Sequence, residues 1–201
     1  MEPPLTKAGH TVQLIGRKEH DKIDAELLIL AMKPKDFDTA PPFTGRLVAS
    51  VLTNTPLAKL REKYPQSTCV RLMPNVGVAY GCGITYITTP ELIPLFEPFG
   101  FVDTIDEKYF PAVAAFTGSG PAFILSLIDT LQEIVDELQL PELTLQLIVS
   151  TLMLLEQSGQ TPQELISRIA PPGGTTEKGL AHFDDVRSAL HRVFKAALPD
   201  A

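Results

Sequence analysis

Residues 27–31 read Leu-Leu-Ile-Leu-Ala, and this run decides the fold of the first half of the chain. Every position in it is apolar, which is typical of a strand in a parallel sheet that is covered on both faces. Similar runs follow at 47–52 and 69–73. A further strand is predicted at 11–15, and the stretch 95–105 reads as a short helix end followed by one more strand. The pattern predicts an α/β architecture.

Helices are expected between these strands and throughout the second half. Thr55 and Pro56 predict a helix start, with Thr as the cap and Pro at the first helical position. From 121 to 138, apolar residues recur at the helical period, and the acidic residues lie mostly on the other side. The stretch Thr161-Pro162-Gln163-Glu164 is a full capping box, and a last helix is expected at 186–198.

The segment 143–155 is apolar on nearly every face of its expected helix. Such a helix needs burial on all sides. A chain of 201 residues supplies that burial by dimerising, or by placing the helix at the centre of a monomeric bundle. The change of pattern near Tyr109 predicts two domains, an α/β domain at 1–108 and an all-helical domain at 109–201.

The charge balance narrows the choice of partners. The formal net charge is −7 and the chain contains no run of Lys or Arg, so nucleic acid and anionic membranes are expected to be repelled. No stretch is expected to span a bilayer. The two cysteines, Cys69 and Cys82, fit a reducing cytoplasm and are expected to be buried or half-buried thiols. The four histidines show no metal-ligand spacing, so no metal site is expected; they are His10, His20, His182 and His191.

Four segments have the composition of a binding site. Pro171–Thr176 combines two glycines with two threonines between expected helices, so it reads either as an anion site at a helix N-terminus or as an ordinary turn and cap. Phe116–Phe123 places small residues and a proline at an expected helix start. Lys33-Pro34 and Arg71–Asn75 follow or end predicted strands, where open α/β sheets bind ligands.

These segments together resemble the pyrroline-5-carboxylate reductase family, which reduces a cyclic imine to proline with NADPH or NADH. The resemblance covers most of the chain and is strongest from 110 to 195. It rests on four stretches in the family's order, at 30–34, 71–75, 117–123 and 172–176. It implies a Rossmann-like parallel-sheet domain, of which this sequence covers a part, followed by an all-helical domain that forms a homodimer or a higher oligomer. It also favours dimerisation as the way in which segment 143–155 is buried.

The resemblance implies a role for individual residues. Gly174 and Thr175, with Thr176, are expected to hold the substrate carboxylate, and the Thr176 hydroxyl to bond the ring nitrogen. Ser119 acts with Thr176 at the reacting ring, and Gly120 and Pro121 line the same pocket. The residues expected to flank the cofactor are Ala31, Met32, Lys33, Pro34, Pro74 and Asn75. No side chain resembles a dedicated general base, and Ser119 has no His–Asp partner pattern of a hydrolase.

The choice of cofactor rests on Gly16-Arg17-Lys18, which follows the predicted strand at 11–15. An acidic side chain at this place binds the adenosine ribose of NAD, whereas Arg17 and Lys18 suit the 2′-phosphate of NADP. The same residues also read as a solvated basic turn. The interpretation favours NADPH, with NADH as the second choice, and a cytoplasmic enzyme of proline biosynthesis.

The sequence also departs from the family pattern. The family begins with a strand and a Gly-rich phosphate loop, and this sequence starts at what resembles the end of the following helix. Shorter connections than in the family are expected between Lys18 and Asp24 and near Thr88–Pro90, and Pro171 stands where the family usually has Ser. Three interpretations stay open: omitted segments of a longer reductase, a non-catalytic dimeric ligand-binding or regulatory protein without a cofactor site, or a reductase for another imine or carbonyl substrate.

Overall fold

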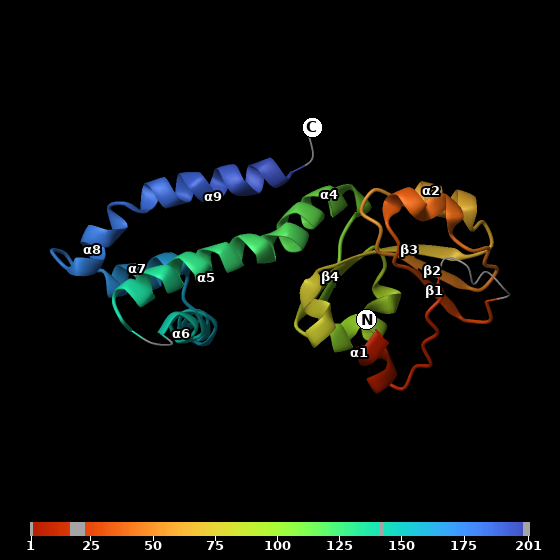
Figure 1. Cartoon of the computed structure of the whole chain (residues 1–201), viewed down its shortest axis with the longest axis horizontal. Helices are drawn as coiled ribbons and strands as arrows, with labels where there is room; N and C mark the ends of the chain where they lie inside the picture. The colour runs from red at the N-terminus through yellow and green to blue at the C-terminus, as the bar shows by residue number, and fades with distance from the viewer. Residues whose placement is uncertain (1, 17–22, 141–142, 199–201) are drawn as a thin grey trace. The chain divides into compact units, whose positions relative to one another are not determined.

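The computed structural model of the chain describes residues 2–16, 23–140 and 143–198 (Figure 1). It divides into two compact units, one built from the residues up to Ser119 and the other from Gly120 to Ala197. The sequence places the change from α/β to helical texture about ten residues earlier, near Tyr109, so the domain boundary at 108/109 stays a prediction. Each unit is described by itself.

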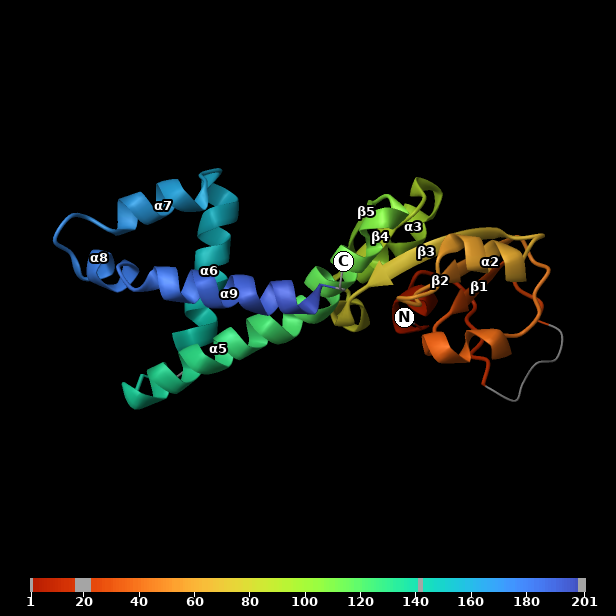
Figure 2. The same ribbon diagram turned by 90° about the horizontal axis from the view of Figure 1, so that it is seen from above.

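The first unit contains a sheet whose strands follow the order β1-β2-β3-β4-β5. Pairing is parallel except between β3 and β4, which are antiparallel. Figure 2 shows the sheet from above, with β1 and β5 at its two ends. The strands predicted from the apolar runs and from 95–105 are therefore confirmed. The bounds are β1 (Leu27–Leu30), β2 (Leu47–Ser50), β3 (Thr68–Pro74), β4 (Gly83–Ile87) and β5 (Gly100–Thr104).

The core lies on both faces of the sheet, as the apolar strands predict. Alternate residues of β2 point to opposite sides, and all four are buried. Val48 belongs to the cluster under η1 (Pro34–Thr39) and α2 (Leu57–Lys63). Ala49 belongs to the cluster under α1 (Glu2–Lys7), α3 (Ile93–Phe96) and η4 (Glu97–Phe99).

Two strand predictions are wrong in part. The segment 11–15 forms no strand: Val12 packs against the core, but Leu14 is 71% exposed, and the segment joins no ladder among the described residues. A segment of residues that favour strands forms one only where a neighbouring backbone can pair with it. The sheet is also not wholly parallel, because β4 follows β3 after a connection too short for a parallel crossover.

The start of α2 differs from its prediction. Thr55 is buried and its side chain does not cap the helix; Pro56 is the N-cap residue. The free backbone N–H of Leu57 instead donates to Oε1 of Glu107, at 2.7 Å. A carboxylate distant in sequence therefore replaces the local cap that the motif predicts.

The segment with small residues lies inside a helix rather than before one. η5 (Glu107–Tyr109), α4 (Phe110–Val113), the π-helix η6 (Ala114–Gly118) and α5 (Ser119–Glu137) follow one another without a break. The Thr117 hydroxyl donates to the carbonyl of Val113, at 2.9 Å, so it caps nothing. The helix start expected at Phe116–Phe123 is thus wrong, because the helix already begins at Glu107 and its wider π turn accommodates the small residues.

The same helix corrects the expectation that no stretch suits a bilayer. Residues 107–137 form a helix that is long and apolar enough to span a membrane by length and composition. The core helix of a protein can have the same length and composition.

The second unit is helical, and its helix predictions are confirmed. After α5 come α6 (Leu143–Ser158), α7 (Pro162–Ile169), α8 (Thr175–Leu180) and α9 (Phe183–Ala197). α9 starts three residues before its predicted start. α5 and α9 lie side by side in Figure 1, and Phe123 packs edge-on against Phe194 with ring centroids 5.1 Å apart. The capping box at Thr161 and Glu164 is present in both directions.

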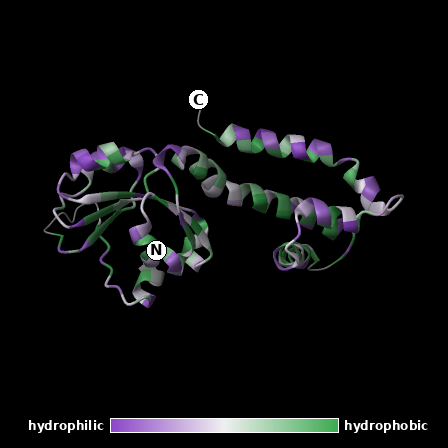
Figure 3. Cartoon of the chain, turned by 180° about the vertical axis from the view of Figure 1, so that it is seen from behind, coloured by the Kyte–Doolittle hydropathy of each residue, from purple (hydrophilic) through white to green (hydrophobic). Residues whose placement is uncertain are grey.

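Apolar side chains on α5 and α6 are left uncovered within the chain. Leu145 is 62% exposed, and Leu152, near the other end of α6, is 60% exposed. Figure 3 shows hydrophobic residues along α5, whereas α9 carries many hydrophilic ones. The monomeric-bundle alternative for α6 is therefore wrong, because a central helix of a bundle has no such exposure. Exposed apolar side chains that follow one another along two helices have the character of a surface that a partner covers.

Candidate functional site

The carboxyl edge of the sheet gathers most of the residues expected to flank a cofactor. Ala31–Pro34 follows β1, and Pro74 and Asn75 end and follow β3. Because β1, β2 and β3 are parallel and adjacent, these two stretches lie at the same edge with the β2 loop between them. Ala31, Lys33 and Pro34 are exposed, and Met32, Pro74 and Asn75 are half-buried. The edge is therefore accessible to a ligand.

Asn75 is held in place by the turn after β3. Its side-chain oxygen accepts hydrogen bonds from the backbone N–H of Gly77, at 3.1 Å, and of Ile84, at 3.0 Å. Its own N–H donates to the carbonyl of Ile84. The carboxamide oxygen is therefore committed to the backbone, and the amide NH₂ is the group with which Asn75 can bind a ligand.

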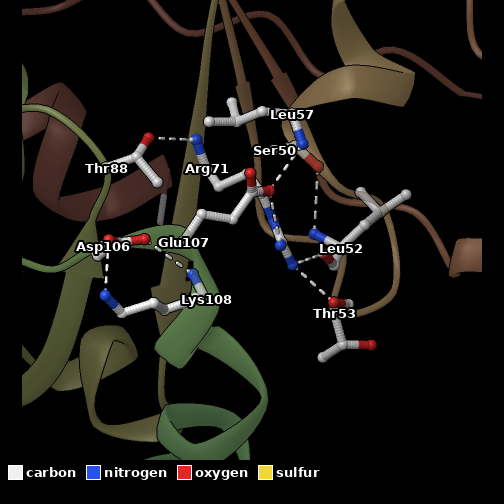
Figure 4. Close-up of polar contacts among 9 residues, drawn as sticks. All are labelled: Ser50, Leu52, Thr53, Leu57, Arg71, Thr88, Asp106, Glu107 and Lys108. Carbon is white, nitrogen blue, oxygen red and sulfur yellow. Dashed lines mark hydrogen bonds and ion pairs between the residues drawn. The ribbon is translucent and has the colours of Figure 1, made fainter.

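A buried arginine, Arg71, lies in β3, three residues before the end of that strand. Arg71 is 4% exposed, and its Nη1 lies 3.0 Å from Oε1 of Glu107. Its Nη2 donates to the carbonyls of Leu52, at 3.3 Å, and Thr53, at 2.6 Å. Figure 4 shows the Glu107 carboxylate between the guanidinium and the backbone nitrogen of Leu57. No sequence motif predicts this pair, although a single cation in an apolar strand indicates a buried partner.

The strand that carries Pro74 and the helix that carries Ser119 meet in the first unit. Met73 forms a small buried cluster with Phe110 and Val113, with Ala114 packed against it. β3 and the π-helical segment are in contact. This packing places the segment that leads to Ser119 beside the strand that leads to Pro74.

Ser119 is the first residue of α5 and is half-buried, and Gly120 is buried. A Cβ on Gly120 would meet only the Phe194 ring, at an ordinary contact distance of 3.8 Å. Within the chain, space alone therefore does not require glycine at this position. Pro121 is the third residue of α5 and is half-buried.

The Gly-rich turn opens α8 as predicted. Gly173 has a φ of 79°, a left-handed conformation that favours glycine, and Gly174 is the N-cap residue. The N–H of Gly174 donates to the Pro171 carbonyl, at 3.0 Å. Because that N–H is used within the turn, the N–H groups of Thr175 and Thr176 remain as the donors at this helix start. Thr176 is half-buried and Thr175 is exposed.

The acidic residue of this turn is Glu177. Its Oε2 accepts a hydrogen bond from the N–H of Gly173, at 2.7 Å. This contact fixes the lead-in to the helix in the manner of a capping box. The turn belongs to the second unit, together with Gly120 and Pro121.

The predicted 2′-phosphate residues, Arg17 and Lys18, lie outside the described residues. Within the described ranges, no group of His, Cys, Asp and Glu is arranged to hold a metal ion. The largest pKa change concerns Tyr64, where burial, with Cys69 nearby, raises the pKa to about 12. Tyr64 donates to the Pro41 carbonyl in the core beneath α2, so its role is structural.

A mostly parallel sheet with an accessible carboxyl edge, followed by a helical unit with uncovered apolar helices, is the architecture of a Rossmann-like domain joined to a helical domain that self-associates. The family model for pyrroline-5-carboxylate reductase dimerisation matches residues 107–201. Pyrroline-5-carboxylate reductase 2 of Bacillus subtilis is 31% identical over 90% of this chain and 72% of its own length. The Synechocystis enzyme is 28% identical over 86% of this chain and 73% of its own. The chain belongs to the pyrroline-5-carboxylate reductase family.

Solved structures agree with this assignment. The 1-pyrroline-5-carboxylate reductase of Streptococcus pyogenes is similar with a TM-score of 0.73 and 26% identity, over 86% of this chain and 75% of that one. The NADP-bound pyrroline carboxylate reductase of Plasmodium falciparum reaches a TM-score of 0.75 at 23% identity, over 86% of this chain and 74% of that one, which supports the fold. The helical unit is accordingly a dimerisation domain, and the family consists of oxidoreductases.

Proposed function

We propose that this chain reduces 1-pyrroline-5-carboxylate to L-proline with NADPH, as an enzyme of proline biosynthesis. The observation that carries the proposal is the Gly-rich turn at 173–176, in a chain whose sheet also exposes the two cofactor-flanking stretches at one edge. The similar proteins of Synechocystis and Bacillus subtilis are named pyrroline-5-carboxylate reductases, which supports this substrate.

The turn before α8 supplies the substrate carboxylate site in this proposal. The N–H groups of Thr175 and Thr176 point out of a helix start, where backbone donors and the helix dipole favour an anion. The resemblance assigns the Gly174 N–H to the same role, but that group is already bonded to Pro171. The carboxylate is therefore held by Thr175 and Thr176, with Gly174 shaping the turn.

The reaction needs orientation more than acid–base chemistry. Reduction adds a hydride to the imine carbon and a proton to the ring nitrogen, so the C=N bond becomes a C–N bond. The Thr176 hydroxyl bonds the ring nitrogen and fixes which face of the ring is presented. Ser119 lies at the same ring, where Gly120 and Pro121 complete the wall. Holding the reacting atoms in line accounts for most of the acceleration in such a step.

The exposed and half-buried residues at the carboxyl edge support a cofactor site there. Ala31, Met32, Lys33 and Pro34 would flank it on one side, and Pro74 and the Asn75 amide on the other, because all six lie at one accessible edge. When bound, NADPH supplies the hydride. Arg17 and Lys18 would pair with the 2′-phosphate; NADH is the weaker candidate. The described residues at this edge include no Gly-rich strand-to-helix turn, so the pyrophosphate contacts are left unassigned.

The working form in this proposal is a homodimer or a larger homo-oligomer in the cytoplasm. Its other partner is the small imino-acid substrate. The uncovered faces of α5 and α6 support self-association, because a reductase with these faces in water would expose a large apolar surface. The negative net charge makes nucleic acid and anionic membranes poor partners.

The site is tested by comparing Thr176→Val with Thr175→Val. Both changes remove a hydroxyl and keep the shape and the backbone N–H, but only Thr176 is proposed to bond the ring nitrogen. Thr176→Val should lower kcat/KM for pyrroline-5-carboxylate by about ten- to a hundredfold, the effect of one lost polar contact at a reacting centre. Thr175→Val should stay near wild type. If the two variants had the same kcat/KM, the Thr176 hydroxyl would not be the group that bonds the ring nitrogen.

A further inference from the structure

We propose that Arg71 and Glu107 are a positioning pair that fixes the β2–α2 loop at the carboxyl edge of the sheet, and through it the affinity for the cofactor. The proposal rests on the function proposed above, since it concerns the same edge. Neither residue is assigned a contact with substrate or cofactor. Both act through the backbone that they hold.

The loop 51–56 lies between the two stretches that flank the cofactor. β2 is the central neighbour of β1 and β3, so the chain that leaves β2 emerges between Ala31–Pro34 and Pro74–Asn75. Any displacement of this loop changes the shape of the edge on both sides. The loop contains no regular structure that would hold it by itself.

Arg71 holds the beginning of the loop. Its Nη2 donates to the carbonyls of Leu52 and Thr53, at 3.3 and 2.6 Å, across from β3 to the loop (Figure 4). The guanidinium also lies over the Phe110 ring, 4.5 Å from its centroid. Only 5% of the side chain is exposed, so these bonds do not compete with bulk water.

Glu107 holds the end of the loop. Its Oε1 accepts both Nη1 of Arg71, at 3.0 Å, and the N–H of Leu57, at 2.7 Å. Leu57 is the first residue of α2, so this bond replaces the missing side-chain cap of that helix. One carboxylate oxygen therefore joins the two ends of the loop to the same guanidinium.

The pair also reaches the helix that carries Ser119. Glu107 opens the helical stretch 107–137, and Phe110, which lies under the guanidinium, is fully buried against Met73. The backbone N–H of Arg71 donates to the Thr88 hydroxyl, which fixes β3 to the residue after β4. Arg71 thus contacts both the β2 loop and the start of this helix.

A lysine at position 71 could not form the same set of hydrogen bonds. Three bonds run from two different guanidinium nitrogens to three separate oxygens, in the plane that the group fixes. A lysine ammonium is a point charge without this planar fork. Nε of Arg71 is buried without a hydrogen-bond partner among the described residues. Burying this donor costs free energy, which the bonds of the other two guanidinium nitrogens offset.

The test compares Arg71→Lys, Arg71→Met, Glu107→Gln and the double variant Arg71→Met/Glu107→Met. Lys108→Met is the control, because it removes the neighbouring but exposed ion pair with Asp106. The double variant guards against misfolding, since replacing a buried pair by apolar residues leaves no uncompensated charge. Circular dichroism and the oligomeric mass establish that each variant is folded.

Two measurements test whether the pair fixes the loop and the affinity for the cofactor. In kinetics, the double variant should raise the KM for NADPH by about tenfold and change the KM for pyrroline-5-carboxylate little. The KM for NADPH of Arg71→Lys should lie between the values of the double variant and of wild type. The KM of Glu107→Gln should be closest to that of wild type, because its amide oxygen still accepts a hydrogen bond. In hydrogen exchange, the Leu57 amide should exchange about tenfold faster in the double variant. Lys108→Met should change neither.

A double variant that keeps a protected Leu57 amide and wild-type KM values would overturn the proposal. An equal rise in both KM values would also overturn it, since that is the effect of general loosening. A wild-type protein without reductase activity would refute the proposed function instead. The exchange of Leu57 would still decide, in that case, whether the pair fixes the loop.

Discussion

The two cysteines show how burial sets the chemistry of one residue type at two positions. Cys69 lies at the start of β3 and is 7% exposed, whereas Cys82 lies in the turn before β4 and is exposed. Desolvation by burial raises the pKa of the Cys69 thiol, and the charge of Arg61 offsets this only in part. The expectation of two buried or half-buried thiols is therefore wrong for Cys82.

Alkylation of the native protein at pH 8 should modify Cys82 and spare Cys69. The thiolate is the reactive form, so a buried thiol with a raised pKa reacts slowly. Peptide mass mapping after a short exposure to iodoacetamide measures both sites, and the unfolded protein is the control in which both should react. Comparable labelling of the two in the native state would mean that β3 opens readily.

At the scale of a single element, α7 begins with reciprocal bonds between Thr161 and Glu164. The N–H of Thr161 donates to Oε2 of Glu164, at 2.8 Å, and the N–H of Glu164 donates to the Thr161 hydroxyl, at 3.3 Å. The backbone and side-chain hydrogen bonds from Thr161 lower the pKa of the Glu164 carboxyl. Thr161→Ala should reduce the free energy of unfolding by about 1 kcal/mol, measured by urea denaturation.

The same box should respond to acid. A carboxyl whose pKa is lower in the folded state stabilises that state at neutral pH, and this contribution is lost as the pH falls through the lowered pKa. An NMR titration of Glu164 should therefore give a lower pKa in wild type than in Thr161→Ala. Identical values in the two proteins would show that the hydrogen bonds of the box do not form in solution.

At the scale of the whole molecule, the apolar faces of α5 and α6 require a partner. Leu152→Glu places a charge where 60% of a leucine is uncovered, and it should weaken self-association by about tenfold or more. Leu14→Glu is the matched control, because Leu14 is 71% exposed but lies in the first unit. Sedimentation velocity over a range of concentrations measures both. A Leu152→Glu protein with the mass of wild type would place the interface elsewhere.

The sequence predicted the elements whose signal is local. The runs in β1, β2 and β3 are apolar at nearly every position, and the capping box of α7 lies within four residues. The predictions failed where the deciding contact is distant. The cap of α2 comes from Glu107, fifty residues away. The strand expected at 11–15 lacks a pairing neighbour, and β4 pairs in the antiparallel sense because its connection is short.

The same distinction between local signals and distant contacts applies to the candidate site. The stretches after β1 and at the end of β3 lie at the same edge of the sheet because parallel strands share an edge, which the strand pattern predicts. The turn at Gly173 and Gly174 was also predicted from its residues. The use of the Gly174 N–H within the turn, and the buried pair of Arg71 and Glu107, depend on atomic geometry that no local pattern contains.

The central claim is tested most directly by incubating the purified protein with NADPH and pyrroline-5-carboxylate. Absorbance at the nicotinamide band follows oxidation, and amino-acid analysis follows the product. We expect oxidation that depends on the imine, with one proline formed for each NADPH consumed. No oxidation in the presence of the imine, while a proline analogue still binds, would contradict it and identify a ligand-binding relative of the reductases.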